Sequence, residues 1–228
     1  MLLTSIFKRI IFSIWFYCKI LTMTEILDGR VQRQQSIYDE NKLKLIDTAI
    51  ELINEIGDIN EVTLTQIAKE AGVSAATAYN HFPDRMSDLF SSIVKTKLDI
   101  RKTFMESMQD QSKSLLDTLR EIPVIYAKKM IEIGYTGKVI ISHMGELMSQ
   151  NKWLDDDPVL VVKTLIEQEG TYKNKSLEIA EKIMTSFRGA MFEYSLNREK
   201  LNNQYSPYTA KKFVSSCETI VEDVLKLY

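Results

Sequence analysis

The stretch from Thr63 to Phe82, which reads TLTQIAKEAGVSAATAYNHF, constrains the fold more than any other part of the chain. Thr63 can cap a first helix whose apolar residues recur at helical spacing, and Gly72 allows the left-handed turn that ends it. Ser74 can cap a second helix directly afterwards. The turn is too short for an antiparallel pair, so the helices must cross steeply, and the small Ala68 allows that contact. This layout is a helix-turn-helix, which presents its second helix to the major groove of DNA.

The same residues resemble the TetR family of transcriptional regulators. The resemblance is carried by Thr63 with Gln66-Ile67-Ala68, by Ala71-Gly72-Val73-Ser74, and by Thr77-Ala78-Tyr79-Asn80-His81-Phe82 with Arg85 and Leu89 following in step. A bare helix-turn-helix pattern is weakly specific, whereas this extended string near the start of a chain of this length is strongly specific. The resemblance covers residues 38–100, and beyond them only length and helical pattern agree.

Helix breakers are few, with 8 Gly and 4 Pro among 228 residues. Because Leu, Ile, Lys, Glu and Met are plentiful, we predict an all-α protein with a three-helix head and a larger helical second domain. The formal net charge is −2, so a local surface, not a polybasic tail, would bind nucleic acid. Cys18 and Cys217 form neither a disulfide framework nor a metal set, and we interpret both as free thiols in a reducing cytoplasm.

We divide the chain into three parts: an N-terminal extension and arm (residues 1–37), a helix-turn-helix head (residues 38–100, with the motif at 63–82), and a helical effector-binding and dimerisation domain (residues 101–228). The apolar run near the start is about half as long as a membrane span, and no secretory cleavage site follows it. Two interpretations stay open, namely translation that begins at Met23, or an interfacial anchor. Residues 24–39 are either a solvated leader or an arm that reaches a minor groove through Arg30 and Arg33.

The outward face of the second short helix carries small or uncharged side chains that can approach base edges closely. Ala75 or Ala76 can pack on a thymine methyl group, and Asn80 can bond an adenine edge. Around this face, hydroxyl, amide and guanidinium groups suit phosphate, as the resemblance also implies for Tyr79 and His81. The predicted DNA-binding residues are Thr63, Thr65, Gln66, Ser74, Ala75, Ala76, Thr77, Tyr79, Asn80, His81 and Arg85. The alternatives are that Tyr79 packs half-buried, that His81 only closes the helix end, and that the alanines are helix filler.

The head carries a net negative charge. Residues 30–100 contain 8 Lys and Arg and 11 Asp and Glu, a net charge of −3. Many of these acids fall on a support helix that starts near Glu40 and lies away from the proposed surface. We therefore expect DNA binding to weaken with salt, with a modest slope.

Two wide apolar stripes near the end of the chain predict a dimer interface. A two-fold four-helix contact would bury the apolar surface that remains after each stripe packs on its own domain. The predicted interface residues are Ile183, Phe187, Ala190, Met191, Tyr194, Phe213, Cys217, Ile220 and Val224. The alternative is that both helices complete a monomeric core.

A ligand pocket inside the second domain is what the resemblance implies. The sequence offers a mixture of apolar, aromatic and polar candidates such as pockets use, and these are Tyr126, Tyr135, His143, Met144, Met148 and Trp153. Each of them is alternatively a core residue. We interpret the triplet Asp155-Asp156-Asp157 as a helix cap and loop, not a metal site, because adjacent carboxylates at a helix start do not converge.

The sequence therefore predicts a cytoplasmic, homodimeric DNA-binding regulator, a repressor that a small-molecule effector releases from its operator. Its predicted partners are double-stranded DNA, a second copy of the chain and that effector, whose identity is unknown. We predict no enzyme activity, catalytic residue, metal or cofactor, because the chain has no nucleophile elbow, phosphate loop or metal-spaced His pair. The alternative is a membrane-tethered helical interaction protein with a degenerate DNA-binding head.

Overall fold

The structure, a computed structural model, describes residues 29–99, 114–153, 157–196 and 209–228. All regular elements within these ranges are helices, so the all-α prediction is confirmed. The chain up to residue 28, which includes Cys18 and Met23, and the predicted domain boundary between residues 100 and 101 lie outside the described residues. The division into three domains therefore stays a prediction.

The chain divides into two compact units, residues 1–43 and 44–228. Helix α2 (Gly29–Ile56) continues across the division. In the first unit, the described residues 29–43 are helical, and most of their side chains are exposed. The part of the predicted arm that follows Gly29 is therefore a helical lead-in.

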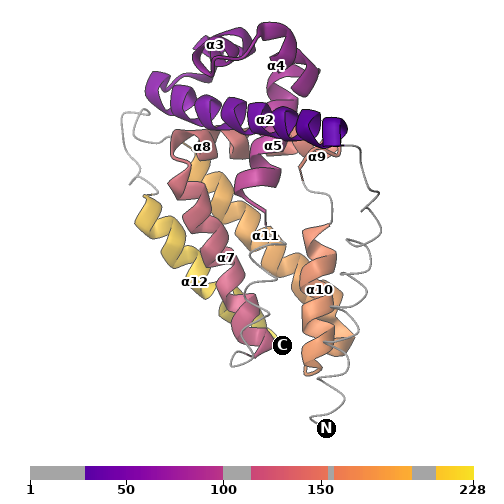
Figure 1. Cartoon of the computed structure of the whole chain (residues 1–228). Helices are drawn as coiled ribbons and strands as arrows, with labels where there is room; N and C mark the ends of the chain where they lie inside the picture. The colour runs from indigo at the N-terminus through magenta and orange to yellow at the C-terminus, as the bar shows by residue number, and fades with distance from the viewer. Residues whose placement is uncertain (1–28, 100–113, 154–156, 197–208) are drawn as a thin grey trace. The chain divides into compact units, whose positions relative to one another are not determined.

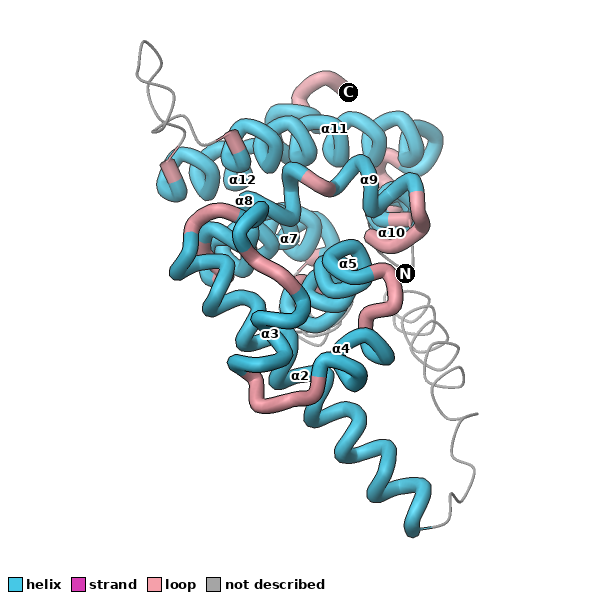
Figure 2. Tube along the Cα trace, turned by 90° about the horizontal axis from the view of Figure 1, so that it is seen from above, coloured by secondary structure: helices cyan, strands magenta, loops and turns pink. Residues whose placement is uncertain are grey.

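The head belongs to the second unit and begins with the C-terminal half of α2. This half buries Leu45, Ile46, Ala49 and Ile53, which is the stripe that their helical spacing predicts. The elements that follow are the 3-10 helix η1 (Ile59–Glu61), α3 (Leu64–Glu70), α4 (Ala75–His81) and α5 (Arg85–Lys97). Figure 2 shows α3 and α4 as two short helices next to each other. Helix α5 follows them in the chain.

The body follows the head in the same unit (Figure 1). Its elements are α7 (Leu115–Glu132), α8 (Tyr135–Ser142), α9 (Met144–Ser149), α10 (Pro158–Glu169), the 3-10 helix η2 (Lys173–Lys175), α11 (Ser176–Ser195) and α12 (Ala210–Leu225). Helix α12 packs on α7 and α11, and α10 packs on α11 and α7. The buried apolar residues of head and body form one continuous cluster.

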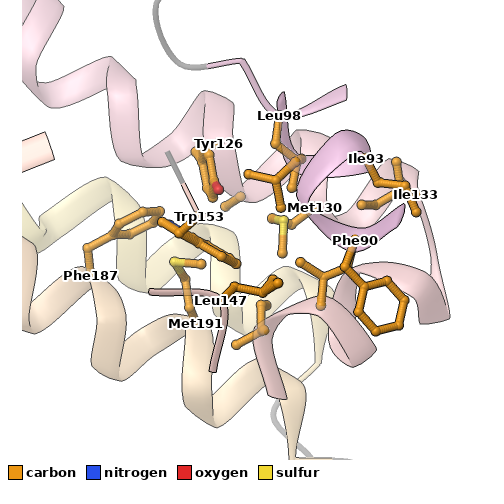
Figure 3. Packing of buried hydrophobic residues seen from close by; sticks show 14 of the residues in the cluster. Phe90, Ile93, Leu98, Tyr126, Met130, Ile133, Leu147, Trp153, Phe187 and Met191 are labelled. Carbon is orange, nitrogen blue, oxygen red and sulfur yellow. The ribbon is translucent and has the colours of Figure 1, made fainter. Parts of the chain in front are cut away.

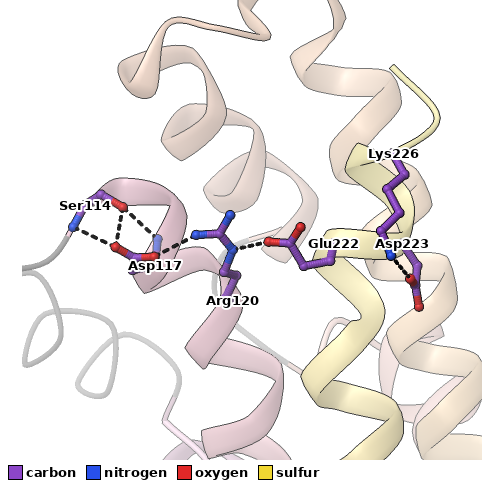
Figure 4. A network of polar contacts seen from close by, with 6 residues as sticks. All are labelled: Ser114, Asp117, Arg120, Glu222, Asp223 and Lys226. Atoms are coloured by element: carbon purple, nitrogen blue, oxygen red, sulfur yellow. Dashed lines mark hydrogen bonds and ion pairs between the residues drawn. The ribbon is translucent and has the colours of Figure 1, made fainter.

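A polar network ties the start of α7 to the end of α12 (Figure 4). The Ser114 hydroxyl donates to Asp117 Oδ2 at 2.6 Å, and Arg120 Nη1 donates to Asp117 Oδ1 at 2.6 Å. Arg120 Nε also donates to the Glu222 carboxylate of α12. The hydrogen bond from Ser114, followed by that from Arg120, holds the pKa of the Asp117 carboxyl below its usual value.

The side chains predicted for the dimer interface are buried within a single chain. They are Ile183, Phe187, Ala190, Met191, Tyr194, Phe213, Cys217, Ile220 and Val224, and none is more than 9% exposed. Helix α11 packs on α10 and α12, and α12 also packs on α7. The wide apolar stripes of α11 and α12 are therefore buried within the protomer. These side chains therefore belong to the core of a single chain, which is the alternative that the sequence left open.

The sulfur of Cys217 is a free thiol, as predicted. Burial, and secondarily the charge of Glu218, raises the pKa of this thiol to about 12. The thiol therefore stays protonated at neutral pH and behaves as a small apolar side chain.

Two predictions concern segments outside the head. Asp157 caps α10, because its carboxylate accepts a hydrogen bond from the Val159 N–H at 2.9 Å, and Pro158 is the first helical residue. No group of three or more His, Cys, Asp or Glu side chains could hold a metal ion within the ranges described above. In those same ranges, no helix combines the length and apolar character needed to cross a membrane.

Candidate nucleic-acid interface

Helix α3 begins with a reciprocal cap. Thr63 Oγ1 accepts a hydrogen bond from the Gln66 N–H at 3.2 Å, and Gln66 Oε1 accepts one from the Thr63 N–H at 2.8 Å. Such a capping box satisfies two backbone donors that a helix start otherwise leaves without partners. The carbonyl oxygen of the Gln66 side chain is thus committed to the cap, which leaves its NH₂ group to donate outward.

The turn after α3 requires glycine. Gly72 has a φ of 67°, which a residue with a Cβ adopts only with strain. The Val73 N–H donates to the Ala68 carbonyl at 2.9 Å, and the Gly72 N–H donates to the Lys69 carbonyl at 3.2 Å. This pair of bonds is a Schellman motif, and it ends α3 where the sequence predicts.

Helix α4 begins at a second cap. Ser74 Oγ accepts a hydrogen bond from the Thr77 N–H at 3.1 Å and lies 2.8 Å from Thr77 Oγ1. Ala78 and the following Phe82 are fully buried and anchor the helix to the head. Because residues three and four apart share a helix face, the opposite face is exposed. We call it the α4 face, and it consists of Ala75, Ala76, Tyr79 and Asn80.

Side chains from three helices meet beside the α4 face. Thr65 Oγ1 of α3 lies 3.4 Å from Tyr79 Oη of α4, and the Arg85 guanidinium carbon of α5 lies 5.9 Å from the centroid of the Tyr79 ring. All three residues are exposed. Hydroxyl and guanidinium groups are ordinary phosphate ligands. The fold therefore gathers three of the predicted DNA-binding residues into what we call the Thr65–Tyr79–Arg85 cluster.

The backbone at Arg85 is unusual. Its φ is 50°, a left-handed value that is uncommon for a residue with a side chain. The Arg85 N–H donates to the Phe82 carbonyl at 2.9 Å, which closes the turn between α4 and α5. Strained backbone of this kind concentrates at functional sites. Here it fixes the point from which the guanidinium group leaves the protein surface.

The position of His81 differs from the prediction. Its side chain is 7% exposed, and its ring lies 6.0 Å from the ring of Phe82. His81 follows Ala78 by three residues, so the helical period turns it to the inner face of α4. The contact predicted between His81 and DNA is therefore withdrawn, whereas the other ten predicted residues keep at least part of their side chains at the surface.

Sequence reasoning missed a set of contacts at the first turn of α5. Lys152 Nζ lies 2.6 Å from Asp84 Oδ2 and 2.8 Å from Asp88 Oδ1. The hydrogen bond to Asp84, followed by that to Asp88, raises the pKa of the Lys152 amine. Ser87 Oγ also donates to Gln150 Oε1 at 2.7 Å. These partners are more than 60 residues apart in the chain, so no local pattern indicates them. They tie the segment after α9 to the start of α5, next to the Thr65–Tyr79–Arg85 cluster.

A second link joins α2 to the start of α8. Asn54 Oδ1 accepts hydrogen bonds from the Thr136 N–H at 2.9 Å and from Thr136 Oγ1 at 3.2 Å, and Asn54 Nδ2 donates to the Ile133 carbonyl at 3.2 Å. Gly134, the N-cap residue of α8, has no side chain with which to cap the helix. A Cβ at Gly134 would lie 2.9 Å from Asn54 Oδ1. Asn54 thus caps α8 from another helix, and glycine at 134 leaves room for it.

The predicted effector-pocket residues do not form one set. Met148 is 41% exposed, and Tyr135 and Met144 are half-buried at the edge of the core. The ring of His143 lies 5.2 Å from that of Phe90, and its Nδ1 lies 2.9 Å from the Val139 carbonyl oxygen. Tyr126 and Trp153 lie together with other buried residues in Figure 3. We call this group the Tyr126 cluster, and it consists of Tyr126, Met130, Leu147, Trp153, Phe187 and Met191.

Two capped short helices, a glycine turn between them and an exposed face on the second define a helix-turn-helix protein. A family model described as bacterial regulatory proteins, tetR family, matches residues 45–93, from the second half of α2 into α5. The helix-turn-helix region of the chain is thus that of the tetR family of bacterial regulatory proteins. The resemblance noted in the sequence is thereby confirmed.

Similar proteins agree with this assignment. HTH-type transcriptional regulators of Staphylococcus aureus strains USA300 and NCTC 8325 are each 31% identical to the chain over 81 residues. That match covers 36% of this chain and 43% of each relative, so it spans less than half the length of those proteins. A solved structure titled SmeT-Triclosan complex has a TM-score of 0.55 and 14% identity, over 83% of this chain and 91% of that chain. The likeness to it is one of fold and includes the body.

Proposed function

We propose that the chain is a sequence-specific DNA-binding transcriptional regulator that acts in the cytoplasm and has no enzymatic activity. The observation that carries the proposal is the exposed, uncharged α4 face, where Ala75, Ala76 and Asn80 are small and Tyr79 belongs to the adjoining Thr65–Tyr79–Arg85 cluster. A small face lets a helix come close to base edges, while the cluster supplies phosphate ligands that set its position. The match to the tetR family model and the names of the relatives support the same function.

The roles proposed for single residues follow from their chemistry. Asn80 has the amide that pairs with an adenine edge, and Ala75 or Ala76 has the methyl group that packs on thymine. Tyr79 and Arg85 hold the backbone phosphates. Backbone N–H groups at the start of α3 and the free NH₂ of Gln66 add donors on the neighbouring phosphate.

Selection of bound sequences from a random duplex pool tests this proposal. We expect a palindromic site. The double variant Tyr79→Phe, Arg85→Ala should weaken binding to every sequence and lower the salt slope by about 1. Asn80→Ala should relax the preference at one base pair by about 1–3 kcal/mol, whereas Asn174→Ala in η2 should leave selectivity unchanged. A pool without an enriched sequence would contradict sequence-specific recognition.

We propose that the regulator is a homodimer that associates through the exposed face of α11. Phe192 is 54% exposed on this face. Gly189, one turn earlier, is also exposed, and a Cβ there would meet nothing within 4 Å. Glycine inside a helix costs about 0.5–1 kcal/mol relative to alanine, and no contact within the described chain explains that cost. A second copy crossing at Gly189 would explain it, because the missing side chain lets two helices approach closely.

Gly189→Ala tests the dimer because it should change protomer stability and dimer affinity in opposite directions. Within the protomer the substitution should stabilise α11 by roughly 0.5–1 kcal/mol, but it should weaken self-association by adding a methyl group at the contact. The control is Gly145→Ala in α9, where a Cβ also meets nothing within 4 Å. Sedimentation equilibrium measures association. Equal dimer affinity in wild type and Gly189→Ala would contradict this contact.

We propose that the regulator is a repressor and that a small-molecule effector releases it from DNA. The contacts from Lys152 to Asp84 and from Asn54 to Thr136 support a coupling between body and head, and a protein of the same fold is titled as a complex with triclosan. An effector shifts the equilibrium by the difference in its affinity for the two states. Deletion of the gene should raise transcription from promoters with the selected site, and a fall would indicate activation instead.

A further inference from the structure

The hydroxyl group of Tyr126 is buried without a hydrogen-bond partner. Tyr126 lies in the middle of α7 and is 4% exposed. No group in the described part of the chain donates to its oxygen or accepts its proton. Burial also raises the pKa of this hydroxyl far above its usual value. The group is therefore neutral, buried and without a partner among the described residues.

The buried serine and threonine hydroxyls of the same unit do have partners. Ser91 Oγ donates to the Lys152 carbonyl at 2.6 Å, and Ser176 Oγ donates to Glu167 Oε1 at 3.0 Å. Thr118 Oγ1 donates to the Ser114 carbonyl at 3.2 Å. The fold thus places carbonyl or carboxylate oxygens next to these groups. Against that pattern, the hydroxyl of Tyr126 stands out.

The surroundings of Tyr126 give the hydroxyl no structural use. The ring of Phe187 meets the Tyr126 ring edge-on, with centroids 5.5 Å apart and an interplanar angle of 78°. The other members of the Tyr126 cluster are two methionines, a leucine and Trp153, drawn in Figure 3. Phenylalanine at position 126 would keep these ring contacts and avoid the desolvation of a polar group. A hydroxyl kept at this cost indicates a partner outside the described residues.

We propose, building on the effector-released regulator above, that the Tyr126 hydroxyl is the polar anchor of the effector site. The ligand it fits is an uncharged aromatic molecule with one hydroxyl or carbonyl group. Its ring would lie among Trp153, Phe187 and the methionine sulfurs, which pack well on aromatic faces. The cluster contains no ionised side chain, so a charged ligand would lose its hydration without compensation.

The same site has a route to the head. Trp153 is adjacent in the chain to Lys152, whose amine contacts Asp84 and Asp88 and whose carbonyl accepts from Ser91. A ligand that enters the Tyr126 cluster must displace packed side chains, because protein cores have little free volume. Displacement of Trp153 would move the partner of Asp84, the residue immediately before Arg85.

Binding of 2-naphthol and of naphthalene to the full chain, measured by equilibrium dialysis without DNA, tests this assignment. The two probes share a ring system and differ by one hydroxyl. We expect the wild type to bind 2-naphthol about five- to tenfold more tightly, which is the effect of one net hydrogen bond. Tyr126→Phe should remove that preference and leave the affinity for naphthalene unchanged. Tyr172→Phe, at η2, is the matched control and should keep the preference.

Three results would overturn the assignment. They are equal affinity of the wild type for both probes, absence of saturable binding of either, and a preference that survives in Tyr126→Phe. Thermal unfolding adds an independent measurement, since Tyr126→Phe should unfold at the same or a higher temperature. A lower temperature would mean that the hydroxyl already has a partner in the chain. Because no DNA is present, failure here leaves DNA recognition untouched, and failure of the duplex selection leaves this result untouched.

Discussion

The helix-turn-helix segment and the body use polar side chains over different distances along the chain. In the segment, the cap bonds join residues three apart, Thr63 with Gln66 and Ser74 with Thr77. The body has local caps as well, at Ser114 and Asp157, but there and in its links to the head other bonds cross between distant helices. Asn54 and Thr136 are 82 residues apart, and Arg120 and Glu222 are 102 apart.

The cap bonds of the helix-turn-helix segment can thus form within a short stretch of chain. The bonds between distant helices form only when those helices pack together. The head contacts its proposed ligand with side chains left exposed on a locally capped scaffold. The body keeps its proposed ligand anchor, the Tyr126 hydroxyl, inside a core formed by several helices.

The largest expected loss of stability tests whether the short motif has a core of its own. Phe82 is fully buried at the end of α4, and Phe82→Ala should cost about 3–5 kcal/mol of unfolding free energy, because it removes a ring and leaves a cavity. Urea denaturation measures this. The control is Tyr79→Phe on the exposed face, which should change stability by less than about 0.5 kcal/mol. Similar values for the two variants would mean that α4 is not anchored as described.

Loss of the distant cap on α8 is the next largest effect. Asn54→Ala leaves the amide of Thr136 and the carbonyl of Ile133 without the partners described above, whereas the Thr136 hydroxyl keeps the Ile50 carbonyl at 3.3 Å, and we expect a loss of about 2–3 kcal/mol. Hydrogen exchange at the Thr136 amide should accelerate in parallel. Asn174→Ala in η2 is the matched control. If both variants had the same stability, the contrast between local and distant bonds would fail.

The parts of the fold that the sequence predicted are those with local signals. The caps at Thr63 and Ser74, the turn at Gly72 and the start of α10 at Asp157 all depend on residues within a few positions of each other. Thr65, Tyr79 and Arg85 were each predicted to contact phosphate, and these roles stay predictions. Their gathering on one surface brings three helices together, which no local pattern indicates.

The failures concern features that depend on which helices become neighbours. The width of the stripes on α11 and α12 could not tell a dimer contact from a core, because periodicity does not count the helices that pack on each side. His81 is a different case, because the helical period after the buried Ala78 already places it on the inner face of α4. The contacts of Lys152 with Asp84 and Asp88 join segments with no common pattern. Such features follow from tertiary packing alone.

A substitution with a smaller expected effect tests the local caps of the helix-turn-helix segment. Ser74→Ala removes the cap of α4 and should cost about 1 kcal/mol, whereas Ser74→Asp should keep most of that stability, because aspartate caps helices as well as serine does. The free energy of unfolding is measured without DNA, so that contacts to phosphate do not enter. Ser215→Ala, on the exposed side of α12, should change little. A Ser74→Asp variant as unstable as Ser74→Ala would show that the cap is not what holds α4 in place.

The smallest expected effect concerns the pH dependence of the distant network in Figure 4. The pKa of Asp117 lies below its ordinary value of 3.8, first because of the hydrogen bond from Ser114 and then because of that from Arg120. A carboxyl with a lowered folded-state pKa stabilises the fold fully above its unfolded value, and this contribution is lost as the pH falls through the lower one. Asp117→Asn should therefore unfold at a lower temperature than the wild type at neutral pH. The difference should shrink below about pH 4 as the wild-type carboxyl is protonated. A gap independent of pH would show that the charge of Asp117 contributes nothing to stability.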